Sequence, residues 1–349
     1  MSERKAEGYD ILAVEQWISQ EIPALAPPFE WARLEGGHSN LTYLLQDQFG
    51  KLAVIRRPPK GELLPKAHDM SREWALISSL GAIGFPVPAA YGFCESNEVT
   101  GAWFYVMDHV EGRSLHNAQH TLDWVPEDRR TDLAYSLIDA LADLHVLNPD
   151  DIGLGELGKK GGYVARQLNT WYRSWMASIR PAGYDDDRVH ELHQYFTGHI
   201  PEQGIARVVH GDFGFHNCLV NEQSTIAAVV DWELASLGDP LADLGYTLNL
   251  FGESQTEIDT NPEMATSVPG FPPRSSLAAR YAERTGRALE KLDYYRGFNY
   301  WKRAVIVHGV YARYAAGQKS TEGIELNRLL QTIDSSLSAA KQAVDRLEY

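Results

Sequence analysis

The sequence lacks most features of secreted, zinc-stabilised and membrane-spanning proteins. Its 349 residues include only two cysteines, Cys94 and Cys218, which are too few for a disulfide framework or a structural zinc site. No apolar run approaches the length of a membrane span, and the opening residues, MSERKAEGYD, carry charge with no apolar signal-peptide segment behind them. These absences predict a protein of the reducing cytoplasm that has no membrane partner.

Basic residues are also scarce. The chain has 32 lysines and arginines against 47 aspartates and glutamates, which gives a formal net charge of −15. A surface for nucleic acid or for an anionic membrane needs a basic stripe, so we expect no nucleic-acid partner. The acidic balance is compatible with a cationic small molecule, but more often it serves only solubility. It makes no prediction of the oligomeric state.

Periodicity divides the residues that are present into two regions. Residues 10–22 and 67–84 show helical spacing, and short apolar stretches of strand character lie around them, including a pair about the polar turn Asp47–Gly50. Beyond Gly112 the pattern is mainly that of amphipathic helices, and the last three are expected at about Ser275–Thr285, Tyr294–Ala316 and Leu326–Leu347. An α+β fold follows, with a small mainly-β region first and a larger helical region after it.

The stretch VVHGDFGFHNCLV, residues 208–220, places polar side chains between two apolar runs. His210, Asp212 and Asn217 match a protein-kinase catalytic loop, which reads H-x-D, four residues and N, with Gly211 at the usual arginine position. In such a loop the carboxylate accepts the proton of the acceptor hydroxyl and the amide oxygen binds a metal ion. The alternative is an Asx-turn, in which Asp212 and Asn217 bond only the loop backbone.

The next apolar run ends at Asp231, in IAAVVDWELASLGDPLADLGY. We expect residues 206–212 and 226–233 to form two strands whose hairpin puts Asp231 beside the catalytic loop. Kinase-like folds carry a second magnesium ligand there, and phosphoryl transfer needs oxygen ligands for magnesium, a base and positive charge on the phosphates. Otherwise Asp231 caps a turn, while Asp239 and Asp243 cap the helix that follows.

Together these segments resemble the aminoglycoside phosphotransferase-like family, a branch of the kinase-like fold with H-G-D in place of H-R-D. Four further stretches are similar to the subgroup that forms the kinase portion of certain multidomain acyl-CoA dehydrogenases: GGHSNLTYLL, VIRRPPKGELLPKAHDMSREWALISSL, FYVMDHVEGRSL and RQLNTWYRSW. The resemblance covers nearly the whole chain. It implies a two-lobed kinase-like fold with a nucleotide-binding N-lobe, residues 1–109, and a C-lobe, residues 110–349, holding the catalytic loop, metal site and acceptor-binding helices.

The resemblance assigns roles to the residues that match the motifs. It implies that Asp212 is the catalytic base, that Asn217 and Asp231 bind Mg²⁺, and that ATP is the phosphoryl donor. His210 would brace the catalytic loop, and Asp243 would support the same loop from the following helix. Each of these roles needs the loop and the metal ligands to be held in a fixed geometry.

The nucleotide site departs from the kinase pattern at its cation. Where kinases carry a strand lysine, the sequence reads LAVIRRPP, so Arg56 stands in its place, and a shift of register would select Arg57 instead. Glu73 resembles the helix glutamate that orients this cation, although a solvated helix residue would look the same. The remaining implied nucleotide contacts are the glycine-containing bend Gly36, Gly37, Ser39 and Asn40, and the hinge Met107, Asp108 and Val110.

The acceptor and the activity leave alternatives open. An ATP-dependent kinase acting on a small-molecule hydroxyl is favoured, and the acceptor is either a hydroxyacyl-CoA or similar alcohol, or an aminoglycoside phosphorylated in the 3′ manner. A nucleotide-binding pseudokinase or scaffold is the alternative of another class, and the presence of Asp212, Asn217 and Asp231 together argues against it. A protein kinase is disfavoured because no activation segment ends in A-P-E.

Aromatic and basic residues of the helical region bear on the acceptor. Trp171, Tyr172 and Trp175 lie on one predicted helix and either line an acceptor pocket or belong to the core. Cations on the helices could bind the phosphates of a coenzyme A thioester, unless they pair with acidic neighbours. These cations are Arg166, Arg173, Arg180, Lys302 and Arg303.

Overall fold

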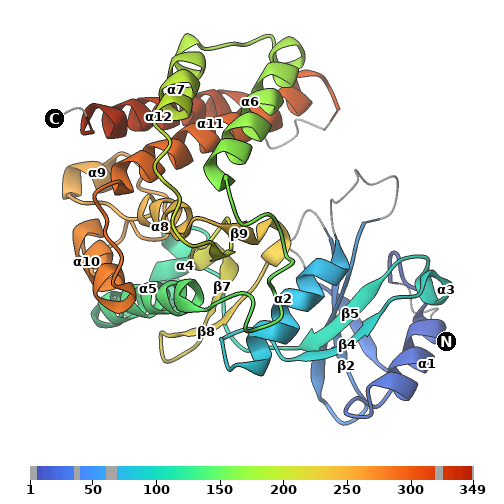
Figure 1. The fold of residues 1–349 in the computed structure, drawn as a ribbon. Helices are drawn as coiled ribbons and strands as arrows, with labels where there is room; N and C mark the ends of the chain where they lie inside the picture. Colours follow the sequence, from blue (N-terminus) through green and yellow to red (C-terminus); the bar gives the residue numbers. More distant parts are fainter. Residues whose placement is uncertain (1–5, 35–39, 60–68, 319–324, 348–349) are drawn as a thin grey trace. The chain divides into compact units, whose positions relative to one another are not determined.

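The chain forms two compact units in a computed structural model that describes residues 6–34, 40–59, 69–318 and 325–347 (Figure 1). Unit 1 comprises Met1–Leu115, Asp150–Leu154 and Phe215–Leu234, and unit 2 comprises His116–Pro149, Gly155–Gly214 and Ala235–Tyr349. We predicted an N-lobe at residues 1–109 that binds the nucleotide and a C-lobe at residues 110–349 that binds the acceptor. This assignment of binding functions stays a prediction.

Unit 1 is built on an antiparallel five-stranded sheet with the order β1-β2-β3-β5-β4. Its first elements are α1 (Ile11–Glu21), β1 (Glu30–Arg33), β2 (Leu41–Gln46), β3 (Leu52–Arg57), α2 (Met70–Ala82), β4 (Ala90–Cys94), α3 (Asn97–Thr100) and β5 (Phe104–Asp108). The later segment adds the 3-10 turns η2 (Phe215–Asn217) and η3 (Trp232–Leu234) and the strands β7 (Cys218–Val220) and β8 (Ile226–Val229).

The two faces of this sheet bury different side chains. On one face, Ala53 and Ile55 of β3 pack in a core with Val14 and Ile18 of α1, and on the other face α2 packs against β4 and β5 (Figure 1). Because successive strand residues point to opposite faces, Arg56 lies on the α2 face.

The turn between β2 and β3 is held by one carboxylate. Asp47 accepts hydrogen bonds from the backbone N–H groups of Phe49, at 2.9 Å, and Lys51, at 2.8 Å. Gly50 takes the left-handed conformation, with φ of 85°, which glycine adopts without steric cost. The turn predicted at Asp47–Gly50 is therefore present, and its side-chain bonds fix where β3 begins.

A short hairpin completes unit 1. β7 pairs with β8, and the N–H of Val230 donates to the carbonyl of Asn217 at 2.9 Å. The expected hairpin of residues 206–212 with 226–233 was wrong, because β6 (Arg207–Val209) pairs instead with β9 (Ser236–Gly238). β7 has only three residues, which is too few for a periodic signal.

Unit 2 is mainly helical. Besides β6 and β9 it contains α4 (Ala118–Trp124), η1 (Glu127–Arg129), α5 (Arg130–Val146), α6 (Tyr163–Ala182), α7 (Asp187–Gly198), α8 (Pro240–Leu248), α9 (Gln255–Asp259), α10 (Arg274–Thr285), α11 (Leu292–Ala315) and α12 (Leu326–Asp345). The helices expected at Ser275–Thr285, Tyr294–Ala316 and Leu326–Leu347 are confirmed, within about two residues at each end. The α+β class is confirmed as well, with the five-stranded sheet in unit 1 and a mainly helical unit 2.

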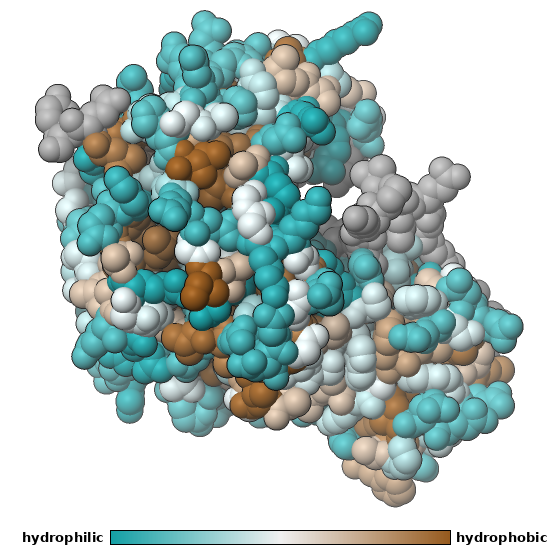
Figure 2. Space-filling view, viewed as in Figure 1, coloured by the Kyte–Doolittle hydropathy of each residue, from teal (hydrophilic) through white to brown (hydrophobic). Residues whose placement is uncertain are grey.

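The core of unit 2 forms where α6, α7, α11 and α12 pack together (Figure 1). Trp175, Phe196, Trp301 and Leu337 are fully buried there, and each contributes on the order of 1.5–3 kcal/mol to stability through burial. On the face drawn in Figure 2, hydrophobic side chains appear as separate patches among hydrophilic ones. Within the described ranges, no helix combines the length and the apolarity needed to cross a membrane.

Candidate active site

Arg56 joins two acidic residues on the α2 face of the unit 1 sheet. Its Nε lies 3.1 Å from Oε2 of Glu73, and its Nη2 donates to Oδ1 of Asp231 at 2.8 Å. Glu73 also accepts from the Tyr105 hydroxyl at 2.9 Å and from the Asn40 amide at 3.3 Å. The helix glutamate, the strand cation and the aspartate after β8 therefore form one connected network.

Burial and charge act against each other in this network. Burial disfavours the charged form of Arg56, but Tyr105, Glu73 and Asp231 outweigh it and raise the pKa of the guanidinium. Burial raises the pKa of Glu73, while Arg56 and the Tyr105 hydroxyl oppose that rise. Since lysine and arginine are rarely this buried without partners, the pairing explains how a cation is kept at this position.

Asp231 has an unusual backbone conformation. Its φ is 64°, in the left-handed region that aspartate tolerates better than most residues. Trp232, buried directly after it, donates to the carbonyl of Val229 at 3.1 Å. A left-handed residue persists only where its neighbours hold it, and here the hairpin and the buried indole do so.

Asn217 and Asp231 are neighbours across the β7–β8 hairpin. The backbone bond between Val230 and Asn217 puts Asn217 opposite the residue that precedes Asp231. An amide oxygen and a carboxylate form a donor set that suits a hard cation such as Mg²⁺, which keeps other positions for water or phosphate oxygens. No three His, Cys, Asp or Glu side chains in the described ranges cluster as a metal site by themselves, so a cation held by Asn217 and Asp231 would take its other ligands from water or phosphate oxygens.

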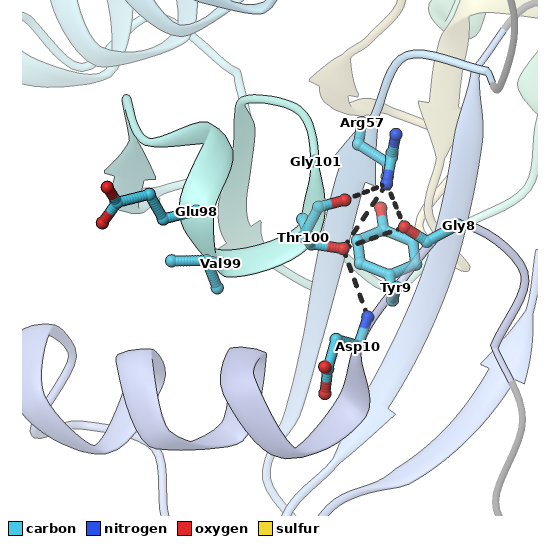
Figure 3. A pocket seen from close by; sticks show the side chains of 8 residues that line it. All are labelled: Gly8, Tyr9, Asp10, Arg57, Glu98, Val99, Thr100 and Gly101. Carbon is cyan, nitrogen blue, oxygen red and sulfur yellow. Dashed lines mark hydrogen bonds between the residues drawn. The ribbon is translucent and has the colours of Figure 1, made fainter.

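Arg57, the next residue, serves a different part of unit 1. Its guanidinium donates to the carbonyl oxygens of Gly8 and of Thr100, the latter at 2.8 Å, and lies 5.7 Å from the centre of the Tyr9 ring. These residues line a pocket of about 560 Å³ (Figure 3). Only Arg56 faces Glu73, so the structure distinguishes the two arginines that the sequence left as alternatives.

The first part of the catalytic-loop motif, as far as Gly214, lies in unit 2, where Asp243 holds it. The backbone N–H groups of His210 and Gly211 both donate to the Asp243 carboxylate, that of Gly211 at 2.8 Å. Gly211 has a φ of 87°, which explains why glycine replaces the usual arginine here. Asp243 lies inside α8, so it is not the helix cap that was one alternative, whereas Asp239 is the N-cap and accepts from the Leu241 N–H at 3.0 Å.

Asp212 is half-buried and has partners from two helices. Burial, the negative charge of Asp212 and their hydrogen bond raise the pKa of Tyr246, on α8. The ammonium of Lys302, on α11, lies 3.4 Å from the carbonyl oxygen of Gly211 and feels the negative charge of Asp212. Asp212 and Asn217 fall in different units because the division lies between Gly214 and Phe215.

The expected nucleotide contacts are only partly described. Gly36, Gly37 and Ser39 lie outside the described residues. Asn40 is buried, and its amide bonds Glu73, while its Oδ1 has no hydrogen-bond partner among the described residues. The expected hinge residues are Met107 and Asp108, which end β5, and Val110, which follows it; the Asp108 carboxylate accepts from the Tyr91 hydroxyl at 2.6 Å.

The aromatic cluster on α6 divides between core and surface. Trp175 is fully buried, whereas Trp171 and Tyr172 are partly buried against the same core. Arg166 bonds the carbonyl oxygens of Gly161 and Lys159. Of the expected phosphate-binding cations, Arg173, Arg180 and Arg303 are exposed, and Lys302 is buried.

A groove of about 1090 Å³ is present in unit 2. It lies among the segment 249–264, α11 and α12, and serine and threonine side chains make up much of its wall. Arg303, Arg328 and Arg346 line it, and Arg328 pairs with Glu263 at 2.6 Å. Glu257, Glu263 and Asp334 line it as well, so the groove offers hydrogen-bonding groups and equal numbers of arginines and carboxylates to an elongated polar ligand.

Comparison with known proteins identifies the family. A sequence model described as the phosphotransferase enzyme family matches residues 30–298. The chain belongs to the phosphotransferase enzyme family. Acyl-CoA dehydrogenase family member 11 of Homo sapiens is 31% identical over 322 residues, which covers 90% of this chain and 40% of that protein. The chain thus spans about two-fifths of the length of this relative, and the predicted relation to acyl-CoA dehydrogenase family proteins is confirmed.

Solved structures agree with this assignment. A candidate aminoglycoside phosphotransferase from Ralstonia eutropha is 27% identical, with a TM-score of 0.79, and the match covers 96% of this chain and 99% of that one. An ADP-bound aminoglycoside phosphotransferase is 13% identical, with a TM-score of 0.57 over 95% of this phosphotransferase chain and 97% of its own. The second likeness shows the fold alone.

Sequence reasoning missed Tyr105 and Tyr246 in this phosphotransferase, and it named Lys302 only as a candidate cation for the phosphates of the acceptor. Tyr105 bonds Glu73, Tyr246 bonds Asp212, and Lys302 contacts the catalytic loop. Tyr105 could have been found, because residues two apart in a strand point to the same face and Met107 was already a candidate nucleotide contact. Tyr246 and Lys302 carry no local signal, since their contacts depend on how α8 and α11 pack.

Proposed function

We propose that this phosphotransferase moves the γ-phosphoryl group of ATP to a hydroxyl of a small molecule, with Mg²⁺ as cofactor. One observation carries the proposal: Arg56 contacts Glu73 at 3.1 Å and Asp231 at 2.8 Å. A cation oriented by a helix glutamate and adjacent to a metal-binding carboxylate is the arrangement that phosphoryl transfer requires, because catalysis there is mostly positioning and charge stabilisation.

The residues of this chain divide the work between them. Arg56 binds phosphate oxygens, for which its planar guanidinium is suited, and Glu73 keeps it aligned. Asn217 and Asp231 would hold Mg²⁺ through their oxygens, and the bound ion would neutralise charge on the phosphates. Asp212 orients the acceptor hydroxyl and accepts its proton. Asp243 fixes the loop that carries Asp212.

A nucleotide as the donor is in keeping with the fold, since structural neighbours are known as complexes with ADP and with GDP, and we propose ATP because the motifs resemble those of kinases. The bend of Gly36, Gly37, Ser39 and Asn40 would approach the phosphates, and the backbone of Met107, Asp108 and Val110 would meet the base. Of these, Asn40 is already linked through Glu73 to Arg56. Exchange of ATP for GTP in the same assay would establish which base is preferred.

For the acceptor we propose a hydroxyacyl-CoA or a similar alcohol rather than an aminoglycoside. The name of the human relative refers to acyl-CoA, and the identity to it extends over 90% of this chain. The unit 2 groove has exposed Arg303 among its lining residues, and a coenzyme A thioester needs cations for its phosphates. A polycationic aminoglycoside instead needs an excess of carboxylates, whereas the three carboxylates that line the groove are matched by three arginines.

The acceptor is tested by direct product detection. Purified protein is incubated with ATP, Mg²⁺ and either hydroxyacyl-CoA thioesters or kanamycin-type aminoglycosides, and mass spectrometry detects an added phosphate. We expect phosphate on the thioester. Efficient phosphorylation of the aminoglycoside alone would overturn the acceptor and leave the kinase standing, while tight ATP binding without transfer to any hydroxyl would favour the pseudokinase.

The two arginines of β3 give a paired prediction. Arg56→Met should raise the Michaelis constant for ATP by about tenfold or more, because a hydrogen bond to a charged group contributes roughly 1.5–3 kcal/mol. Arg56→Lys keeps the charge but loses the planar guanidinium, so its Michaelis constant for ATP should lie between those of the parent protein and Arg56→Met. Steady-state kinetics at varied ATP concentration measure this.

Arg57→Met is the matched control. It should leave the Michaelis constant for ATP unchanged and lower the free energy of unfolding, since the carbonyl of Thr100 loses a buried donor, at a cost of about 1–3 kcal/mol, while the carbonyl of Gly8 keeps the Thr100 hydroxyl as a donor. The reverse pattern, with ATP binding lost only in the Arg57 variant, would move the phosphate contact to Arg57.

A further inference from the structure

A buried lysine lies against the catalytic loop in unit 2. Lys302 is 7% exposed, although lysine is among the residues least often buried. Its ammonium lies 3.4 Å from the carbonyl oxygen of Gly211 and 5.7 Å from the centre of the Trp171 ring. Burial lowers its pKa, while the negative charges of Asp212 and Asp243 oppose the shift.

Lys302 ends a row of buried polar side chains on α11. Tyr295, Asn299 and Lys302 follow one another at spacings of four and three residues, which places them on one helical face. The Tyr295 hydroxyl donates to Asp239 at 2.7 Å, and the Asn299 amide donates to the carbonyl of Ala242 at 2.8 Å. The first two members therefore bind α8, and the third reaches the catalytic loop.

α8 and α11 are close enough for this row to act as a rigid brace. A Cβ atom added at Gly245 would come within 2.9 Å of the backbone carbon of Tyr295, so the two helix backbones are nearly in contact at this point. α8 also supplies Asp243, which binds the loop through the N–H groups of His210 and Gly211. The loop is thus held from α8 and from α11 together.

α8 and α11 bind the two backbone polar groups of Gly211. The N–H of Gly211 donates to Asp243, and the carbonyl of Gly211 accepts from Lys302. That carbonyl belongs to the peptide unit that contains the Asp212 nitrogen, and peptide units are planar. Fixing the carbonyl therefore fixes the plane from which the Asp212 side chain departs. Gly211 needs such a clamp, because glycine has the most backbone freedom of any residue.

We propose that Lys302 is a positioning residue for phosphoryl transfer, which clamps the Gly211–Asp212 peptide so that the Asp212 carboxylate meets the acceptor hydroxyl. This inference rests on the proposed function. A misplacement of about 1 Å by a residue outside the chemistry can cost about a hundredfold in rate, so the clamp can matter although Lys302 touches no substrate. The two carboxylates, Asp212 and Asp243, offset part of the cost of burying this ammonium.

The test compares three variants of the whole chain. Lys302→Met keeps the length of the side chain and removes the charge, Lys302→Arg restores the charge, and Lys341→Met removes a charge from an exposed position on α12 as the control. Transfer to the hydroxyl acceptor, binding of ADP, thermal unfolding and amide hydrogen exchange are measured for each. Hydrogen exchange reports on the loop even if no acceptor is phosphorylated, so failure of the proposed function is distinguishable.

For Lys302→Met we expect kcat to fall by about ten- to a hundredfold, with the Michaelis constant for ATP changed less than about twofold. Amide exchange should rise in the peptide spanning residues 207–215 and not in α6 or α12. Lys302→Arg should recover part of kcat, and Lys341→Met should match the parent protein in all measurements.

Two results would overturn the inference. One is a Lys302→Met protein whose loop exchanges at the parental rate and whose kcat stays within about twofold. The other is a rise of exchange throughout unit 2 with a lowered unfolding temperature, which would make Lys302 a residue of the fold alone.

Discussion

Asp212→Asn should lower the turnover number by about a hundredfold or more and leave ATP binding intact, since general-base catalysis typically contributes a factor of 10²–10⁴. The amide retains an oxygen that can accept from the Tyr246 hydroxyl, but it cannot take the proton of the acceptor. Steady-state transfer of phosphate to the acceptor and calorimetric titration with ATP measure the two effects separately.

The control for this variant is Glu222→Gln, the same carboxylate-to-amide change at an exposed position in the turn between β7 and β8. Its kinetics should equal those of the parent protein. Near-normal phosphoryl transfer by Asp212→Asn would remove Asp212 from the reaction and leave its loop with a structural role.

Asp231→Asn should weaken magnesium-dependent nucleotide binding by at least about tenfold, since changes to residues that only support metal ligands already cost about 10–100-fold in affinity. Asparagine is the informative replacement, because it also tolerates the left-handed backbone with φ of 64°. The measurement is ATP affinity as a function of Mg²⁺ concentration.

Asp231→Ala extends the same experiment. Alanine loses the metal oxygen and also adds strain of about 1 kcal/mol in the left-handed conformation, so it should bind magnesium and nucleotide as poorly as the asparagine variant and unfold at a lower temperature. Magnesium titration curves that coincide for Asp231→Asn and the parent protein would reduce Asp231 to a turn residue.

The sequence predicted long elements better than short ones. Helices such as α10, α11 and α12 repeat their apolar residues over several turns, so their limits were predictable within about two residues. β7 and β9 have three residues each, and no pattern of period two can be recognised over that length. For this reason the ladder partner of residues 226–229 was mistaken, although the nearness of Asn217 and Asp231 was anticipated.

The site was predictable as a set of residue types and not as a set of contacts. The spacing of Asp212, Asn217 and Asp231 could be recognised in the sequence because kinase-like folds keep these residues at similar intervals. Lys302 was predicted only as a candidate cation for the phosphates of the acceptor, since nothing in its neighbourhood on α11 shows that the ammonium is directed at a loop about 90 residues earlier. Long-range contacts of this kind depend on the packing of helices, which the local sequence does not encode.

The turn between β2 and β3 determines which arginine of β3 faces Glu73. The sequence of β3, LAVIRR, is apolar or basic on both faces, so a shift of one residue would meet little resistance from burial. The turn closed by Asp47 must therefore determine that Arg56 rather than Arg57 reaches Glu73. An insertion of one residue in that turn would direct Arg57 instead of Arg56 towards Glu73, although no active-site residue would be mutated. We therefore expect the composition of this turn to tolerate change better than its length.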